Sequence, residues 1–122
     1  MGTVNGAQLV VKALKNENVS VIFTLCGDDD VVYRYAVDAG IRLVDFRHEQ
    51  ATGHAAQAWS IATGEVGVCL TQSGPGFTDL VPSITVAYAS CIPVVALTSQ
   101  TPMSFTHKLP ANEFDAVKLY EH

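Results

Sequence analysis

One acidic residue, Glu49 in Arg47-His48-Glu49-Gln50, stands where an apolar run (41–46) gives way to an alanine-rich stretch. In an open α/β sheet, ligands bind where strands end and the following helices begin. A carboxylate in that position would lose solvent, which suits proton transfer at neutral pH. An ordinary explanation stands beside this one, because acidic residues are common in the first turn of a helix, where they favour its positive end.

A glycine turn, Ser73-Gly74-Pro75-Gly76, is the second candidate site. It follows the apolar run 66–71, and glycines between a strand and a helix let the backbone approach a ligand, while free amide groups there can bind an anion or a polar ring. The turn matches neither the Walker loop nor the dinucleotide fingerprint, and without a Gly-x-Ser-x-Gly motif Ser73 is no candidate nucleophile. Taken alone, such a turn is most often structural.

The elements that must position these residues alternate between strand and helix, with short connections. This pattern predicts a three-layer α/β fold, an open and mainly parallel sheet with helices on both faces. The predicted strands are 19–25, 41–46, 66–71 and 93–98. The predicted helices begin near Asn5, Asp28, Glu49 and Thr78, end near Asn16, Gly40, Gly64 and Ser90, and are followed by a short last helix capped by Asn112.

Local signals refine these helices. Gln8 can complete a capping box with Asn5, and Gly40 is expected to be a left-handed cap. The triplet Asp28 to Asp30 is expected to cap a helix rather than to bind a metal, and Pro82 fits only within a first turn. The side chains expected to face the core are Leu9, Val10, Ala13, Leu14, Val32, Tyr35, Ala36, Ala39, Ala51, Ala55, Ala58, Trp59, Ala62, Phe114 and Val117.

Composition limits the class of protein. The 122 residues are 48% hydrophobic and 16% charged with a net charge of −5, which predicts one domain (1–122) with part of its surface on a partner. The absence of a basic cluster argues against nucleic acid and anionic membranes, and the absence of a signal or spanning segment predicts a cytoplasmic protein. The three cysteines are expected to be reduced thiols, with Cys69 in the core, and no spacing supports a zinc site.

Several segments together resemble a known domain. The chain resembles, from about residue 8 to 100, the N-terminal pyrimidine-binding domain of thiamine diphosphate enzymes, in the group of acetolactate synthase, benzaldehyde lyase and 2-oxo-acid decarboxylases. The segments that carry this resemblance, in order and spacing, are Arg47-His48-Glu49-Gln50, Gly53-His54-Ala55-Ala56, Ala62-Thr63-Gly64, Gly67-Val68-Cys69-Leu70, Ser73-Gly74-Pro75-Gly76, Ala87-Tyr88 and Ile92-Pro93-Val94-Val95.

The resemblance implies a role for each candidate site. The residue matching Glu49 hydrogen-bonds ring nitrogen N1′ of the cofactor's aminopyrimidine and favours the imino tautomer that takes the thiazolium C2 proton. Ser73, Gly74, Pro75 and Gly76 would border the pyrimidine, as would Gly27, which stands in Thr24-Leu25-Cys26-Gly27 where the family has Gly-Val-Pro-Gly. His48, Gln50 and His54 are not implied as catalysts.

The resemblance also implies partners. In this family a separate domain or subunit holds the diphosphate and its magnesium, and the domains pair, so we expect a homodimer and a diphosphate-binding partner. The chain stops soon after its last predicted helix, which predicts a sheet that is truncated at its C-terminal end or completed by another chain.

Three functions are therefore considered. The chain is half of a thiamine diphosphate lyase, decarboxylase or transferase acting on 2-oxo acids or related carbonyl compounds and inactive alone, or a catalytically silent binding or regulatory module of the same fold, or another small-ligand α/β domain such as a nucleotide binder. The last is weakest, because no phosphate-binding fingerprint is present.

Overall fold

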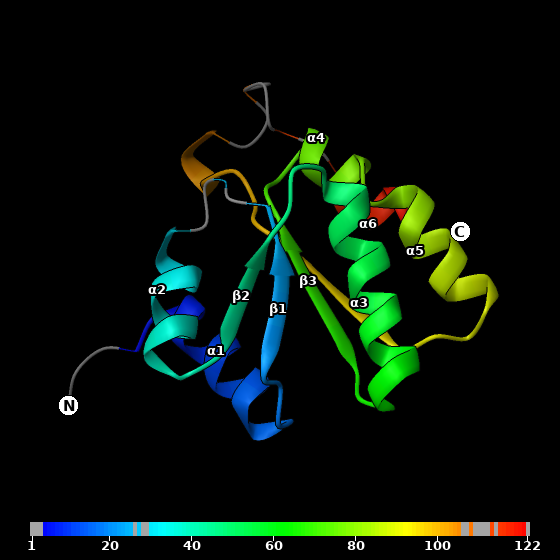
Figure 1. Cartoon of the computed structure of the whole chain (residues 1–122). Helices are drawn as coiled ribbons and strands as arrows, with labels where there is room; N and C mark the ends of the chain where they lie inside the picture. Colours follow the sequence, from blue (N-terminus) through cyan, green and yellow to red (C-terminus); the bar gives the residue numbers. More distant parts are fainter. Residues whose placement is uncertain are drawn as a thin grey trace.

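The central element is a sheet of four parallel strands, β1 (Val21–Thr24), β2 (Arg42–Asp45), β3 (Gly67–Thr71) and β4 (Val94–Thr98), in the order β2-β1-β3-β4 (Figure 1). The computed structural model describes residues 4–25, 27, 30–105, 108, 113 and 115–121. After β1 the chain moves outward to β2 and then returns across β1 to β3, so the strand order reverses between β1 and β3. In open α/β sheets this reversal creates a crevice at the carboxyl ends of the strands.

Helices cover both faces of this sheet. Helices α1 (Gly6–Asn16) and α2 (Asp30–Asp38) contact each other on one face, and α3 (Glu49–Thr63) and α5 (Val81–Ala89) contact each other on the other. Right-handed crossovers require this division, because the connection through α2 runs in the opposite direction to those through α3 and α5. The short elements are α4 (Pro75–Thr78), the 3₁₀ turn η1 (Met103–Phe105) and α6 (Ala116–Leu119). The predicted three-layer α/β fold is confirmed.

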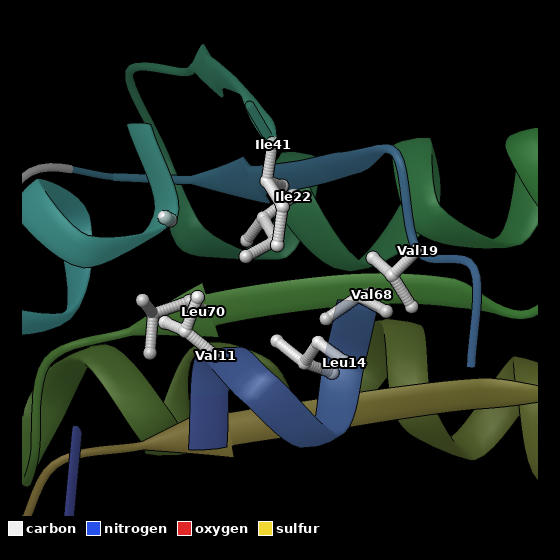
Figure 2. Packing of buried hydrophobic residues seen from close by; sticks show 8 residues of the cluster. Val11, Leu14, Val19, Ile22, Ile41, Val68 and Leu70 are labelled. Carbon is white, nitrogen blue, oxygen red and sulfur yellow. The ribbon is translucent and has the colours of Figure 1, made fainter. Parts of the chain in front are cut away.

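Alternation along the strands divides the core into two clusters. Ile22, Val68 and Leu70 point towards α1 and α2, where Val11 and Leu14 pack onto them (Figure 2). Their neighbours Val21, Phe23 and Cys69 point to the opposite face, towards α3, α4 and α5. The predicted burial of Cys69 is confirmed, whereas Cys91 is exposed and Cys26 lies outside the described residues.

Several predicted helix ends are confirmed. The side chains and backbones of Asn5 and Gln8 form the reciprocal capping box of α1. Gly40 and Gly64 have left-handed φ angles of 73° and 75° at the ends of α2 and α3, and Ala36 is buried with Val32, Tyr35 and Ala39 packed beside it. Asp30 begins α2, and Asp28 and Asp29 lie outside the described residues.

The predicted buried stripe of α1 was correct only at Leu14. Leu9 is 56% exposed, and Val10 and Ala13 are exposed as well, whereas Val11 is buried. Because residues 9 to 11 are all apolar, more than one rotation of α1 about its axis would place an apolar side chain against the sheet. The position of the sheet therefore decided which one packs inward.

The helix predicted from Thr78 to Ser90 is in fact two helices. α4 ends at Thr78, and α5 begins at Val81 with Pro82 in its first turn, as expected for that proline. A continuous helix would need an amide hydrogen at Pro82 to reach the Thr78 carbonyl, and proline has none. The last helix was also misplaced, because Asp115 caps α6 and Val117 is 77% exposed, while Asn112 and Phe114 lie outside the described residues.

Within the part of the chain that the structure describes, no helix is both long enough and apolar enough to cross a bilayer.

Candidate functional site

The candidate residues gather at the carboxyl edge of the sheet. Glu49 begins α3 after β2, the glycine turn follows β3, and Gly27 follows β1. Figure 1 places α4 and the first turn of α3 at the same end of the sheet. These segments therefore meet where the strand order reverses between β1 and β3, although Gly27 and Gly76 are far apart in the sequence.

Glu49 is held at the start of α3 by its neighbours. His48 is the extended N-cap (φ −157°, ψ 136°), and its Nδ1 accepts a hydrogen bond of 3.2 Å from the backbone amide of Gln50. The Thr52 hydroxyl donates to the Glu49 carbonyl at 2.6 Å. The Glu49 side chain is only 8% exposed, and the described residues give its carboxylate no hydrogen bond and no ion pair. A buried carboxylate in that state is free to bind a ligand.

The buried face of α3 agrees with the predicted face at Ala55 and Trp59, which pack partly buried against the core, and differs from it at other positions. The inward residues are Glu49, Thr52, Gly53, Ala56, Gln57 and Ser60, whereas Ala58 and Ala62 are exposed. Close packing explains the difference, because a Cβ at Gly53 would lie 2.7 Å from the Ser83 Cβ of α5. The Gln57 amide also donates to the Ser83 carbonyl. Small side chains and the hydrogen-bonded Gln57 pack against α5, and Glu49 lies at the N-terminal end of the same buried face.

The glycine turn lies directly against Glu49. Gly74 has φ 68° and ψ −121°, which is a glycine conformation, and Pro75 starts α4. A Cβ built on Gly76 would lie 3.2 Å from Oε1 of Glu49. The absence of a side chain at Gly76 thus leaves room for the carboxylate, and the structure brings together two residues that were predicted from separate motifs.

Several amides of this turn are already used. The backbone amides of Phe77 and Thr78 both donate to the Gly74 carbonyl at 3.0 Å. The Ser73 amide donates to the Ser99 hydroxyl at 3.1 Å, which ties the turn to the end of β4. The amides of Ser73, Phe77 and Thr78 are therefore not free for an anion, and Pro75 is exposed rather than directed at Glu49. Glu49, by contrast, has a buried carboxylate with no hydrogen bond from a described residue.

Sequence reasoning missed Gln72. Its side chain lies between two glycines, because a Cβ at Gly27 would be 2.8 Å from the Gln72 Cβ and one at Gly76 would be 2.7 Å from its Cγ. The position directly after a buried strand and before a glycine turn was the available signal.

The C-terminal segment packs against the glycine turn through Tyr120. The Tyr120 hydroxyl donates to the Phe77 carbonyl at 3.1 Å, and the two rings lie 4.8 Å apart. Burial raises the pKa of Tyr120 to about 12, with the nearby Cys69 adding to the shift. Tyr120 thus stays protonated and keeps donating this hydrogen bond at neutral pH.

The histidines flanking the site are surface residues. His54 is exposed on α3, and its Nε2 lies 3.3 Å from the Gln50 Nε2. The ring of His48 accepts the hydrogen bond from the Gln50 amide that caps α3. Neither is placed against the Glu49 carboxylate by any contact among the described residues.

Known proteins match this chain over almost its whole length. The family described as thiamine pyrophosphate enzyme, N-terminal TPP binding domain matches residues 4–119, and the chain belongs to this family. The family is one of thiamine diphosphate-dependent enzymes, so the predicted class and its cofactor are confirmed at that level.

Among individual relatives, the chain is similar to acetolactate synthases. It is 41% identical over 116 residues to a probable acetolactate synthase large subunit of Methanocaldococcus jannaschii, covering 94% of this chain and 20% of the relative. It is 46% identical over 99 residues to an acetolactate synthase of Mycobacterium avium, covering 80% and 16%. It is 39% identical over 116 residues to the acetolactate synthase isozyme 2 large subunit of Escherichia coli, covering 94% and 21%. The chain spans about a fifth of the length of these curated relatives.

Proposed function

We propose that this chain supplies the pyrimidine-binding half of a thiamine diphosphate site in a lyase, decarboxylase or transferase acting on 2-oxo acids or related carbonyl compounds. The observation that carries the proposal is the buried Glu49 carboxylate, which has no partner among the described residues and lies beside Gly76. The similarity to acetolactate synthases supports the substrate class.

The residues of the site fit an aminopyrimidine. The ring is flat and polar at its edges, and the site offers a buried carboxylate beside a position that has no side chain. Glu49 would hold the ring, and Gly27, Ser73, Gly74, Pro75 and Gly76 would border it. Bound thiamine diphosphate supplies a thiazolium carbon that adds to carbonyl groups and accepts electrons from the bond that breaks.

The role of Glu49 is to hold and move a proton at its Oε1. The first turn of α3 fixes the carboxylate, because the Thr52 hydroxyl and the His48 ring both hydrogen-bond the backbone around it. Its burial excludes water that would compete for the carboxylate, so a pyrimidine ring nitrogen would be the preferred partner. Such positioned proton transfer typically contributes a factor of about 10² to 10⁴ in rate.

The charged end of the cofactor requires another domain. No cluster of three or more metal-binding side chains occurs in the described part of the chain, and the amides of Ser73, Phe77 and Thr78 at the glycine turn already have acceptors within the chain. We therefore propose that a separate diphosphate-binding domain or subunit holds the diphosphate and Mg²⁺, and that this chain alone binds the cofactor weakly.

The decisive experiment is a calorimetric titration with thiamine diphosphate and Mg²⁺. The chain is titrated alone and then with a diphosphate-binding domain from a related enzyme. Binding that requires the second domain supports a half-site, whereas no binding in either format supports a silent module instead. In the combined system, Glu49→Gln should slow deuterium exchange at the thiazolium C2 at least 100-fold while assembly persists. The control is Glu65→Gln, because Glu65 is an exposed carboxylate, and equal exchange rates in both variants would remove Glu49 from the mechanism.

Self-association is proposed through the α3/α5 face. From Gln50 to His107 the sequence contains two charged residues, Glu65 and Asp79, so α5 has none and α3 has none after Glu49. Ile61 is 70% exposed on α3, and Tyr88 is 86% exposed on α5. Depletion of charge together with exposed aromatic and aliphatic side chains is typical of the core of an interface.

Sedimentation equilibrium tests this dimer. Wild type should be dimeric, and Ile61→Lys should be monomeric because two buried ammonium groups would face each other across the interface. Leu9→Lys is the matched control, since Leu9 is exposed on α1 at the opposite face and this variant should remain dimeric. A wild-type chain that stays monomeric at every concentration would contradict the proposed dimer.

A further inference from the structure

Helix α4 carries the glycine turn but is too short to fix its own position. It has four residues, and isolated helices shorter than about 12 residues are marginal in water. The hydrogen bonds of α4 join residues within 74–80, with one exception among the described residues. That exception is the Phe77 carbonyl, which accepts a hydrogen bond of 3.1 Å from the Tyr120 hydroxyl. A side chain at the end of α6 therefore supplies the hydrogen bond that ties α4 to another part of the protein.

Packing reinforces this hydrogen bond. The rings of Tyr120 and Phe77 lie 4.8 Å apart, and Phe77 is buried. Tyr120 and Ala116 both pack, partly buried, against the core cluster that contains Phe77 and Cys69. Among the helices and strands, α6 has the most extensive contact with α4. The position of α4 thus depends on Tyr120 through a hydrogen bond and through an aromatic contact.

Helix α4 in turn covers one side of the Glu49 carboxylate. Gly76 lies so close that a Cβ built on it would be 3.2 Å from Oε1 and 3.6 Å from Cγ of Glu49. Because Gly76 and Phe77 are adjacent in the chain, a displacement of Phe77 moves Gly76 relative to this carboxylate. The backbone around Glu49 is fixed separately, by hydrogen bonds to the Thr52 hydroxyl and the His48 ring. The gap between the carboxylate and Gly76 is therefore set from the side of α4.

The hydroxyl of Tyr120 is not needed to fill space. A phenylalanine ring would occupy the same volume, and burying a hydroxyl is unfavourable unless it forms a hydrogen bond. Burial also raises the pKa of Tyr120 to about 12, so the hydroxyl remains a donor at neutral pH. The feature that distinguishes Tyr120 from a purely apolar residue is thus its hydrogen bond to α4.

We propose that Tyr120 is a positioning residue of the Glu49 site, and that its hydrogen bond to the Phe77 carbonyl holds Gly76 against the Glu49 carboxylate. This inference rests on the proposed function and adds to it a residue that acts on the site from α6. Tyr120 sets the gap in which a ring would lie beside Glu49, without touching the ring. Loss of its hydroxyl should therefore slow proton transfer at Glu49 more than it weakens cofactor binding, because the partner domain would still hold the diphosphate.

The first measurement is amide hydrogen exchange of the unliganded full chain, followed by NMR, in wild type and in Tyr120→Phe. This variant keeps the ring and removes the hydroxyl. The amides of Phe77 and Thr78, which donate to the Gly74 carbonyl, should exchange about fivefold faster in the variant. The amides of α1, on the opposite face of the sheet, should keep their wild-type rates.

The second measurement is deuterium exchange at the thiazolium C2 in the combined two-domain system, at saturating thiamine diphosphate and Mg²⁺. Tyr120→Phe should slow this exchange about tenfold and change the dissociation constant by at most about twofold. A loss of folding stability alone would lower the amount of folded chain and leave the rate within the saturated complex unchanged. The matched control is Tyr35→Phe, because the Tyr35 hydroxyl accepts a hydrogen bond of 3.2 Å from the Asn5 side chain, away from α4. It should match wild type at the amides of α4 and at C2.

The two measurements together decide the inference. Faster exchange at the amides of α4 together with slower exchange at C2 supports it. Wild-type amide exchange in Tyr120→Phe overturns it, and so does an equal acceleration in α1, because the effect is then global. Faster exchange in α4 with an unchanged C2 rate overturns it too, because the position of α4 then has no influence on Glu49. In these cases the proposed function stands if Glu49→Gln still slows C2 exchange, whereas a wild-type system without C2 exchange contradicts the proposed function and this inference together.

Discussion

The close approach of α3 to β3 leads to a sharp prediction for Gly67→Ala. A Cβ at Gly67 would lie 2.6 Å from the Ala56 carbonyl carbon and 3.0 Å from its Cα, and closer still to the carbonyl oxygen. Ordinary contact begins at 3.4 Å. The atoms that obstruct the methyl group belong to the backbone of α3, so the helix itself has to move away from the strand.

The expected magnitude follows from two opposing effects. Overpacking of a core costs about 1–3 kcal/mol, and an obstructing backbone puts this case at the upper end. Alanine restricts the unfolded chain and returns about 0.4–1 kcal/mol. The net loss is about 2 kcal/mol, which is a large part of the roughly 5–15 kcal/mol that stabilise a domain. The urea midpoint should fall by about 1 M.

Urea unfolding monitored by Trp59 fluorescence measures this change. Trp59 is the single tryptophan, lies on α3 and packs edge-on against Phe23 at 6.1 Å, so it reports the helix that has to move. Gly6→Ala is the control, because a Cβ at Gly6 meets nothing within 4 Å and should stabilise the helix by about 0.5 kcal/mol. A midpoint for Gly67→Ala equal to or above that of wild type would refute the predicted clash.

Three further predictions concern the cap of α3 and the buried titratable groups. His48→Ala should cost about 1 kcal/mol of unfolding free energy because it removes the acceptor for the Gln50 amide, whereas His48→Asn should retain most of it, and urea titration compares them. Iodoacetamide at about pH 8 should modify exposed Cys91 and spare Cys69, because burial raises the pKa of the Cys69 thiol to about 12; equal labelling by mass spectrometry would contradict this. The unfolding free energy should be constant just below about pH 9 and fall between about pH 9 and 12. Burial raises the pKa of Cys69 from 9.0 and that of Tyr120 from 10.0 to about 12 in the folded chain, so the unfolded chain loses these protons first as the pH rises. The decrease in unfolding free energy should be smaller in Tyr120→Phe, which is the check.

The sequence by itself indicated the secondary structure elements of this protein and several helix ends. Alternating apolar runs and turn residues predicted the four parallel strands, because hydrophobic period and glycine position act over a few residues. The capping box of Asn5 and Gln8, the left-handed Gly40 and the first-turn position of Pro82 were predicted for the same reason. The matched segments between Arg47 and Val95, taken together in order and spacing, indicated the family, which the match over residues 4–119 confirms.

Tertiary packing decided which side of each helix is buried. In α3 the sequence favoured Ala58 and Ala62, yet the closest packing falls elsewhere, at Gly53 against Ser83 of α5 and at Ala56 against Gly67 of β3. In α1 the choice between Val10 and Val11 depended on where the sheet lies. Neither could be foreseen, because side chains of similar hydrophobicity differ in burial only through neighbours that are distant in sequence.

The candidate site likewise combines local sequence motifs with an arrangement that only the tertiary structure provides. Its parts, Glu49 and the glycine turn, were visible as separate motifs, because each stands where a strand ends. Their contact at Gly76, and the place of Gln72 between Gly76 and Gly27, depend on the strand order β2-β1-β3-β4. That order brings together the ends of strands that are far apart in the chain, and such proximity is a property of the assembled sheet rather than of any segment within it.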